Sequence, residues 1–184
     1  MNGHHLILGE LDDFVTGERL ADTHDERYRQ RLSRLLVEEK GFARHELEPR
    51  FALHVSAGEK RAIVPIDLLV RLEDRICMLI KYGPGSITTR HRPALAASRL
   101  VAGYQIPVVV VTNGREADIL DGRSGRNIAS DLTAIPTRDE LSTAMAAHDF
   151  VCLNPGRLER EARIVYAYEV DGGCPCDDTV CRLT

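Results

Sequence analysis

The sequence contains no hydrophobic run long enough to cross a membrane as a helix. Its longest apolar segments, such as residues 106–111, are far shorter than the roughly 20 residues that a membrane helix requires. The first residues, MNGHHLILGELDD, contain no basic segment followed by a long apolar stretch, so a secretory signal is not predicted. We therefore expect a cytoplasmic protein.

The sequence also has no excess of positive charge. Lys and Arg number 24 against 28 Asp and Glu, which gives a net charge of -4. This balance excludes a strong positive field over the whole surface, although it leaves room for a local basic groove that binds nucleic acid. Five cysteines in a cytoplasmic protein are expected to be reduced thiols or metal ligands rather than a disulfide framework.

What the sequence does contain is typical of one globular domain. Its 184 residues are 43% hydrophobic and 28% charged, which is enough apolar material for a sizeable core. No internal repeat, low-complexity tract or linker divides the chain.

Residues 63–81, IVPIDLLVRLEDRICMLIK, consist of two apolar runs on either side of a charged turn. Each run is short and the first is rich in Ile, Val and Leu, which predicts a hairpin of two largely buried strands. Asp67 lies inside the first run, and Lys81 ends the second. A charge in a buried strand is costly to desolvate, so an acid and a base placed in this way indicate a functional site.

Periodicity and capping signals predict the order of the other elements. Thr23 and Glu26 form a potential capping box before a helix that ends near Gly41. The predicted elements are a short helix within residues 11–20, a helix over 24–40, strands over 46–55, 61–70 and 75–82, a helix that begins at 88 or 93 and ends near 104, strands over 106–112 and 116–120, and helices that begin after the caps Thr137 and Asn154 and end near 147 and 169.

Four stretches of this pattern resemble the PD-(D/E)xK nuclease core and, more narrowly, the N-terminal domain of type I restriction enzyme R subunits. They are the helix with Glu26 that ends at Gly41-Phe42, the strands over 66–70 and 79–81, and residues 107–121 with Thr112-Asn113-Gly114. The resemblance, over residues 23–121, implies an α/β restriction-endonuclease-like fold: an αβββαβ core with a mixed sheet flanked by helices, here with extra C-terminal helices. Within one domain overall, we expect an N-terminal extension over 1–22, the nuclease-like core over 23–128, and C-terminal helices with a cysteine-containing tail over 129–184.

In that family two acids bind Mg²⁺ and a lysine positions or activates the attacking water. Mg²⁺ prefers about six hard oxygen ligands, polarises phosphate and lowers the pKa of bound water. By position, Asp67 matches the first acid and Lys81 the lysine, while Glu26 matches an auxiliary acid that some members place on the first helix. The resemblance thus implies catalysis by these three residues, with Mg²⁺ at Asp67 and Glu26. The alternatives are structural: a hydrogen-bonded or arginine-paired Asp67, a Lys81 that reaches solvent, and a Glu26 that only caps its helix.

Leu79 departs from the family pattern, because it occupies the position of the acid two residues before the lysine. A leucine side chain cannot ligate a metal. Some members supply this acid from the following helix, but residues 88–104 contain no Asp or Glu. Asp25, Glu38 and Glu39 compete with Glu26 as acids of the first helix that could complete the site.

The segment that follows the loop over residues 83–86, Gly-Pro-Gly-Ser, is basic. We predict that Arg90, Arg92, Arg99 and Ser86 contact nucleic acid, because basic side chains beside such a loop can meet phosphates without reading sequence. The alternative is a solvated helix face. The loop lacks the GK[ST] ending of a P-loop, so nucleotide binding is not predicted.

Three cysteines lie close together at the C-terminus. Cys174, Cys176 and Cys181 are spaced C-x-C-x₄-C and, with Cys152 or Cys77, could complete a four-thiolate site for Zn²⁺ or an iron–sulfur cluster. A disulfide within the tail and free thiols are the alternatives.

Three functional hypotheses remain open. The first is a nuclease-like domain that binds DNA and whose cleavage is impaired or lost because of Leu79. The second is a weakly active Mg²⁺-dependent deoxyribonuclease whose site is completed by an acid of the first helix. The third is a scaffold or metal-binding module that acts through the cysteine tail and binds no nucleic acid. The expected partners are DNA and, by the resemblance, other restriction or repair subunits.

Overall fold

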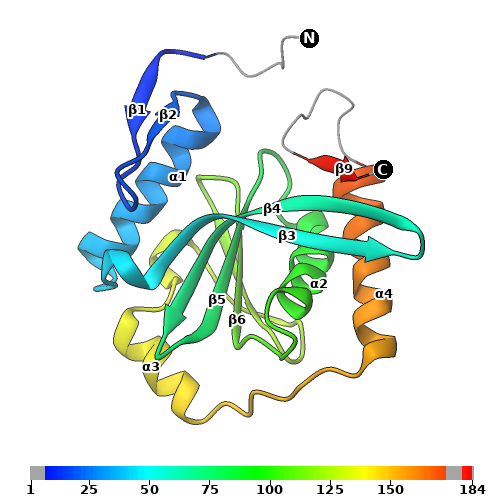
Figure 1. Cartoon of the computed structure of the whole chain (residues 1–184). Coiled ribbons are helices and arrows are strands. Elements are labelled where there is room, and N and C mark those ends of the chain that lie inside the picture. The colour runs from blue at the N-terminus through cyan, green and yellow to red at the C-terminus, as the bar shows by residue number, and fades with distance from the viewer. Residues whose placement is uncertain (1–6, 173–179, 184) are drawn as a thin grey trace.

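A single mixed sheet forms the centre of the molecule in the computed structural model, which describes residues 7–172 and 180–183 (Figure 1). The strand order is β3-β4-β5-β6-β7-β8, with β9 paired to β4. β5 and β6 pair in parallel, and the other pairs are antiparallel. The strands are β3 (Leu47–Ala57), β4 (Lys60–Leu72), β5 (Arg75–Tyr82), β6 (Val108–Thr112), β7 (Ala117–Asp121), β8 (Asn127–Ser130) and β9 (Cys181–Leu183).

Helices cover both faces of this sheet. α2 (His91–Val101) and α4 (Pro155–Val165) pack together over one face, while α1 (His24–Arg34) and α3 (Arg138–Ala146) lie over the other (Figure 1). Strand β6 shows the division, because Val109 and Val111 belong to the apolar cluster of α2 and α4, and Val108 and Val110 to that of α1 and α3. The αβββαβ order, the mixed sheet and the flanking helices that the sequence predicts are confirmed. None of the helices in the described part of the chain has the length and apolar character needed to cross a membrane.

The hairpin expected within residues 63–81 is present as β4 and β5. Leu68 lies opposite Ile80 in an antiparallel pair. Glu73 and Asp74 turn the chain with φ of 49° and 64°, the left-handed conformation of a two-residue hairpin turn whose twist matches its strands. The apolar residues of β5 are almost completely buried, so this hairpin is part of the core on both faces.

The helix predicted over residues 24–40 is present. α1 continues as a π-helical segment, Leu35–Glu39, and Gly41 follows with φ of 79°, a conformation that glycine adopts without strain. The Thr23 hydroxyl accepts a hydrogen bond from the backbone N–H of Glu26 at 3.1 Å, which is half of the predicted capping box. The Glu26 carboxylate does not complete the box, because it accepts hydrogen bonds from the side chains of Arg29 and Gln30.

The later helices also begin at their predicted caps. Thr137 and Glu140 form a complete capping box at α3. Asn154 Oδ1 accepts a hydrogen bond from the Arg157 backbone N–H at 2.8 Å at the start of α4, which continues as a π-helical segment, η5 (Tyr166–Asp171). A 3₁₀ turn, Thr88–Arg90, precedes α2.

The short helix expected within residues 11–20 is wrong, because β1 (Glu10–Asp12) and β2 (Arg19–Ala21) form a separate two-stranded hairpin there. Asp13 Oδ1 accepts hydrogen bonds from the backbone N–H groups of Val15 and Thr16 at 2.8 and 2.7 Å. Such side-chain bonds to the local backbone favour a turn over a helix. The short strands β8 and β9 are not predicted from the sequence either, because neither has a clear alternating pattern.

Candidate functional site

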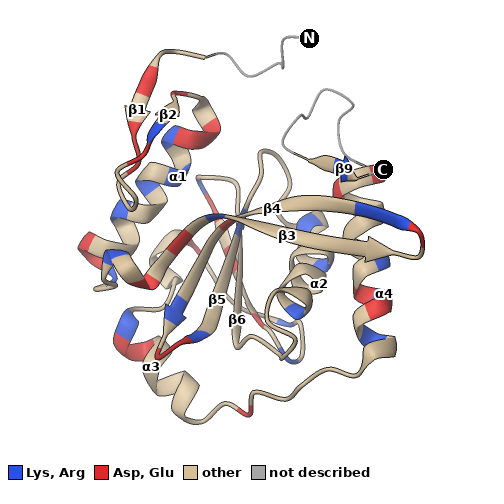
Figure 2. Ribbon diagram, in the orientation of Figure 1, with Lys and Arg blue, Asp and Glu red and all other residues tan. Residues whose placement is uncertain are grey.

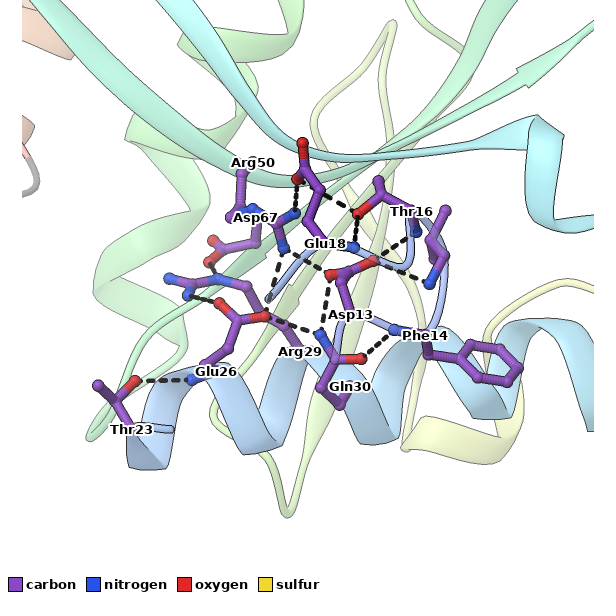
Figure 3. A network of polar contacts seen from close by, with 11 residues as sticks. Asp13, Phe14, Thr16, Glu18, Thr23, Glu26, Arg29, Gln30, Arg50 and Asp67 are labelled. Atoms are coloured by element: carbon purple, nitrogen blue, oxygen red, sulfur yellow. Dashed lines mark hydrogen bonds and ion pairs between the residues drawn. The ribbon is translucent and has the colours of Figure 1, made fainter. Parts of the chain in front are cut away.

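Asp67 is a buried carboxylate in the middle of β4, with 6% of its surface exposed. Its Oδ1 atom accepts a hydrogen bond from Arg29 Nε at 2.8 Å. Its Oδ2 atom accepts one from the backbone N–H of Tyr82 at 2.8 Å. The first bond, shown in Figure 3, comes from α1, and the second comes from the end of β5. Both oxygens of Asp67 are therefore held by the protein.

Glu26 reaches the same guanidinium from the first turn of α1. Its Oε2 atom lies 2.9 Å from Arg29 Nη1. Its Oε1 atom accepts a hydrogen bond from Gln30 Nε2 at 2.8 Å and a longer one from Arg50 Nη1 at 3.4 Å. In a capping box the Glu26 carboxylate would accept a hydrogen bond from the Thr23 backbone N–H, and these side-chain bonds take its place. Glu26 and Asp67 therefore contact the same cation, Arg29.

Arg29 is therefore the central group of the site, and its side chain is only 19% exposed. Burial alone would lower the pKa of Arg29, but the carboxylates of Asp67 and Glu26 raise it above its ordinary value. A guanidinium has five N–H donors and no acceptor, so it remains charged and satisfies both acids at once. The sequence shows only that Arg29 follows Glu26 by three residues on a helix, which is too common a spacing to single it out.

The network continues from Glu26 to the N-terminal hairpin through Arg50 (Figure 3). Arg50 lies in β3 with φ of 55°, and its Nη1 atom is 2.6 Å from Asp13 Oδ2. Burial would raise the pKa of Asp13, but the bonds from Arg50, the Thr16 backbone and Gln30 outweigh it and lower the pKa to about 2. Asp13, Arg50, Glu26, Arg29 and Asp67 thus form one continuous chain of charged contacts.

Lys81 lies at the end of β5 but shares none of these partners. Its Nζ atom donates to the Pro65 carbonyl at 2.9 Å and lies 3.2 Å from Glu169 Oε2 in η5. The lysine side chain is 10% exposed. The structure therefore joins Asp67 to α1 and Lys81 to the C-terminal helical segment, and Glu169 is a partner that the sequence pattern does not reveal.

Leu79, which the resemblance aligns with the family's second acid, is completely buried. It belongs to the apolar cluster on the α2 and α4 face of the sheet. No other acid is brought to this position by α2, since the segment from residue 88 to 104 has none.

The donor set around Asp67 does not fit Mg²⁺. All four oxygens of Asp67 and Glu26 accept hydrogen bonds from protein N–H groups. The Arg29 guanidinium between them also repels a second cation at the same place. Within residues 7–172 and 180–183, no three His, Cys, Asp or Glu side chains are grouped so that they could hold a metal ion.

The loop over residues 83–86 and the basic residues after it lie at the carboxyl end of β5. Arg90 donates to the Pro84 carbonyl at 3.1 Å, and its guanidinium occupies the space that a side chain at Gly83 would need. Ser86 is exposed. Arg92 and Arg99 instead turn toward α4, where they pair with Glu161 at 2.7 and 2.8 Å, and Arg99 is 8% exposed.

An aromatic pair, Tyr28 and Tyr82, lies next to Asp67 and is not predicted from the sequence. Tyr28 stacks on Tyr82 with ring centroids 4.3 Å apart, and its hydroxyl is 2.9 Å from Thr112 Oγ1. Burial raises the pKa of Tyr28, so its hydroxyl stays protonated at neutral pH. The Thr112-Asn113-Gly114 motif is the feature of the sequence that could have indicated this pair, because Thr112 is the hydrogen-bond partner of Tyr28.

Only part of the predicted cysteine site falls within the described residues. Cys174 and Cys176 lie outside the described residues. Cys181 is an exposed free thiol in β9, and Cys152 is also exposed and free. Cys77 is buried, and burial raises the pKa of its thiol to about 11, so it remains a neutral thiol.

Comparisons with known proteins place the chain in a family. The family described as type I restriction enzyme R protein N terminus (HSDR_N) matches residues 24–136. This segment contains α1, the hairpin of β4 and β5, α2 and the strands through β8, and with them Glu26, Asp67, Leu79 and Lys81. No curated protein and no solved structure matches the chain. Because the match spans more than half of the 184 residues, the chain belongs to the family of type I restriction enzyme R protein N termini.

Proposed function

We propose that this chain is a DNA-binding domain, related to restriction enzymes, that has lost phosphodiester cleavage. The observation that carries the proposal is the Arg29 guanidinium, which lies 2.8 Å from Asp67 Oδ1 and 2.9 Å from Glu26 Oε2. Both carboxylates that the family resemblance assigns to Mg²⁺ are thus already paired with a cation of the protein.

The loss of cleavage follows from what a guanidinium can do in place of a metal. A catalytic cation polarises the phosphate and lowers the pKa of a water molecule that it coordinates. A guanidinium neutralises the two acids, but it has no coordination site at which a water could be ionised. Leu79 supplies no further ligand, and the Lys81 ammonium is engaged by Pro65 and Glu169.

We propose that DNA lies over the loop of residues 83–86 and the start of α2. Ser86 is exposed there, and the Arg90 side chain lies against the loop. Arg92 is 44% exposed although it pairs with Glu161, so its guanidinium has donors left for a phosphate. Arg99 is buried in its own pair with Glu161, and in this proposal it positions α2 against α4 without touching DNA. The proposed protein partners, other subunits of a restriction system, rest on family membership alone.

Cleavage is tested with supercoiled plasmid and with single-stranded DNA in Mg²⁺ and in Mn²⁺. The wild-type chain is expected to leave both substrates intact, and so is Asp67→Ala. Cleavage by the wild-type chain that disappears in Asp67→Ala would contradict the loss of activity.

That contrary result would support a second candidate function, a weakly active Mg²⁺-dependent endonuclease. One observation favours it: α1 brings Glu26 to the same guanidinium that Asp67 contacts. The metal would then have to displace Arg29, and Glu26→Gln should abolish the cleavage together with Asp67→Ala.

DNA binding is tested by fluorescence anisotropy with a labelled duplex over a range of salt concentrations. Neutralising two phosphate contacts in the double variant Arg90→Gln/Arg92→Gln should weaken binding about tenfold at low salt and reduce the salt dependence. Arg123→Gln/Arg126→Gln is a matched control that also removes two charges, because both arginines are exposed between β7 and β8, at the opposite end of β6 from the loop. An equal effect of the control variant, or no binding of the wild-type chain at low salt, would overturn the proposal.

A further inference from the structure

The N-terminal hairpin carries the whole net negative charge of the molecule. Residues 1–22 contain five acids, Glu10, Asp12, Asp13, Glu18 and Asp22, and one cation, Arg19. The rest of the chain therefore has 23 cations and 23 anions, and no net charge. The hairpin also precedes residue 24, where the family match begins. Figure 2 shows acidic positions, in red, on β1, which lies beside the mixed red and blue positions of α1.

Polar contacts, more than apolar packing, hold this hairpin to the core. Asp13 Oδ2 accepts bonds from Arg50 Nη1 at 2.6 Å and from Gln30 Nε2 at 2.9 Å. Glu18 lies 3.2 Å from Arg50 Nη2, and Asp22 forms two bonds of 2.6 Å with Arg27. None of the buried residues of the two apolar core clusters comes from the hairpin.

The one buried aromatic ring of the hairpin, Phe14, also rests on cations. The guanidinium carbons of Arg34 and Arg44 lie 4.4 and 4.1 Å from its ring centroid. Arg50 completes a group of three arginines beneath the hairpin, and its φ of 55° is unfavourable for a residue with a side chain. The contacts with Asp13 and Glu18 favour this conformation of Arg50.

The hairpin does not fill the space next to α1. A groove of about 500 Å³ lies between them, lined by Leu11 and Asp12 of the hairpin and by five residues of α1, which are His24, Arg27, Gln30, Arg31 and Arg34. A segment held by ion pairs beside an open groove can be displaced at a lower cost than one packed into the core, because its partners can exchange one anion for another.

We propose that the acidic hairpin covers a phosphate-binding surface formed by Arg34, Arg44 and Arg50, and that DNA displaces it from this surface. The hairpin carboxylates then act as an intramolecular competitor of DNA phosphates. Because Arg50 is also linked to Glu26 and through Arg29 to Asp67, the displacement would reach the candidate site itself. This inference rests on the proposed DNA-binding function and adds its regulation.

Asp13→Asn is the variant that separates the hairpin from the core while keeping its turn. The asparagine Oδ1 atom can still accept the bonds from the backbone N–H groups of Val15 and Thr16. Its Nδ2 group replaces Oδ2 and faces two donors, Arg50 Nη1 and Gln30 Nε2, so the contact with the core becomes repulsive. We expect this variant to bind a labelled DNA duplex about tenfold more tightly than the wild-type chain at low salt.

Glu10→Gln is the matched control, because it changes the charge of the hairpin by the same amount. Among the residues that the structure describes, Glu10 pairs within the hairpin, with Arg19 at 2.8 Å, and both side chains are exposed. We expect less than about a twofold change in affinity from this variant. In Asp13→Asn, the further change Arg50→Gln should remove the gain, because it deletes a proposed phosphate contact.

The outcomes separate this inference from the proposed function. If the wild-type chain binds DNA and Asp13→Asn binds no more tightly than Glu10→Gln, the covering role of the hairpin is wrong and DNA binding stands. If Arg50→Gln leaves the gain intact, the proposed surface is wrong. If no variant binds DNA at low salt, both the inference and the proposed function fall.

Hydrogen exchange on the wild-type chain gives a readout that does not depend on how well a variant folds. Saturating DNA should speed the exchange of backbone amides in residues 8–22 and leave those of β4 and β5 unchanged. Unchanged or slower exchange of the hairpin amides in the DNA complex would overturn the proposal.

Discussion

At the scale of single residues, Arg29 determines how the candidate site can work. The two carboxylates that the resemblance assigns to metal binding lie against its guanidinium, so the protein itself supplies the charge that balances them. Buried acids without such a partner would be strongly destabilising or would become protonated. The chain can therefore keep both acids in its interior.

Removal of the Arg29 charge tests this role. Arg29→Met leaves Asp67 and Glu26 buried without their shared cation, and the free energy of unfolding should fall by about 3 kcal/mol. The loss is measured by urea unfolding at neutral pH. Arg31→Met, on the exposed side of the same helix, should change stability by less than about 0.5 kcal/mol. Equal losses in the two variants would contradict this role.

Asp13 predicts a specific dependence of stability on pH. Its pKa in the folded protein is about 2, below the ordinary value of 3.8, so the unfolded chain binds more protons between these values. The contribution of Asp13 is therefore fully present above about pH 4 and is lost as the pH falls toward about 2. The difference in unfolding free energy between the wild-type chain and Asp13→Asn should shrink over this range. A difference that does not change with pH would show that the carboxylate charge is not what binds the hairpin.

At the scale of elements, Glu161 joins the two helices that cover one face of the sheet. It projects from α4 and pairs with Arg92 and Arg99 of α2, and also with Arg157 one turn earlier at 3.7 Å. α2 is thus fixed where it presents Arg90 and the loop before it to solvent. Within this basic segment, Arg92 and Arg99 therefore help to hold α2 against α4. Arg90 has no part in these pairs and lies against the loop.

Glu161→Gln should destabilise the protein by about 3 kcal/mol, because Arg99 would then be buried without a carboxylate. Glu159→Gln is the matched control on the same helix. Glu159 pairs with Arg163 at the surface, and the loss of an exposed pair costs less than about 1 kcal/mol. Urea unfolding of the two variants measures the difference. A loss of similar size from both would mean that the pairs with Glu161 contribute no more than an exposed pair does.

At the scale of the whole molecule, two segments outside the matched residues 24–136 are fastened to the core by charged side chains. The N-terminal hairpin is held through Arg50, and the C-terminal η5 segment is held through Lys81. The lysine that the family resemblance assigns to catalysis therefore has a structural partner, Glu169, that comes from beyond the family match. The hairpin and η5 are thus each joined to the core by an ion pair.

The pair of Lys81 and Glu169 should show a measurable coupling energy. Lys81→Met should lower stability by about 1–2 kcal/mol and speed hydrogen exchange in residues 155–171. A double-mutant cycle with Glu169→Gln isolates the pair. Lys60→Met is the control, because Lys60 contacts the same segment through an exposed pair with Asp171 at 3.5 Å. A coupling energy of zero, or an equal effect of the control variant, would contradict the structural role of Lys81.

The sequence by itself determined the order of the elements, most of the helix caps, the buried hairpin with Asp67 and Lys81, and the family. These depend on local propensity and on the period of apolar residues, which act over a few neighbours. The N-terminal hairpin could not be predicted from the sequence. The bonds from the backbone to the Asp13 side chain stabilise a turn there, and the same residues could also have formed a helical turn.

Only the tertiary structure decided which charges meet. The contact between Arg29 and Asp67 joins residues 38 positions apart, and Glu169 reaches Lys81 from the last helical segment. Several arginines and acids in the sequence could have made these pairs, because the charge of a side chain and its position along the sequence do not select its partner. The packing of α1 and η5 against the sheet made the selection, because only the groups brought within hydrogen-bond distance in the interior could offset each other's loss of water.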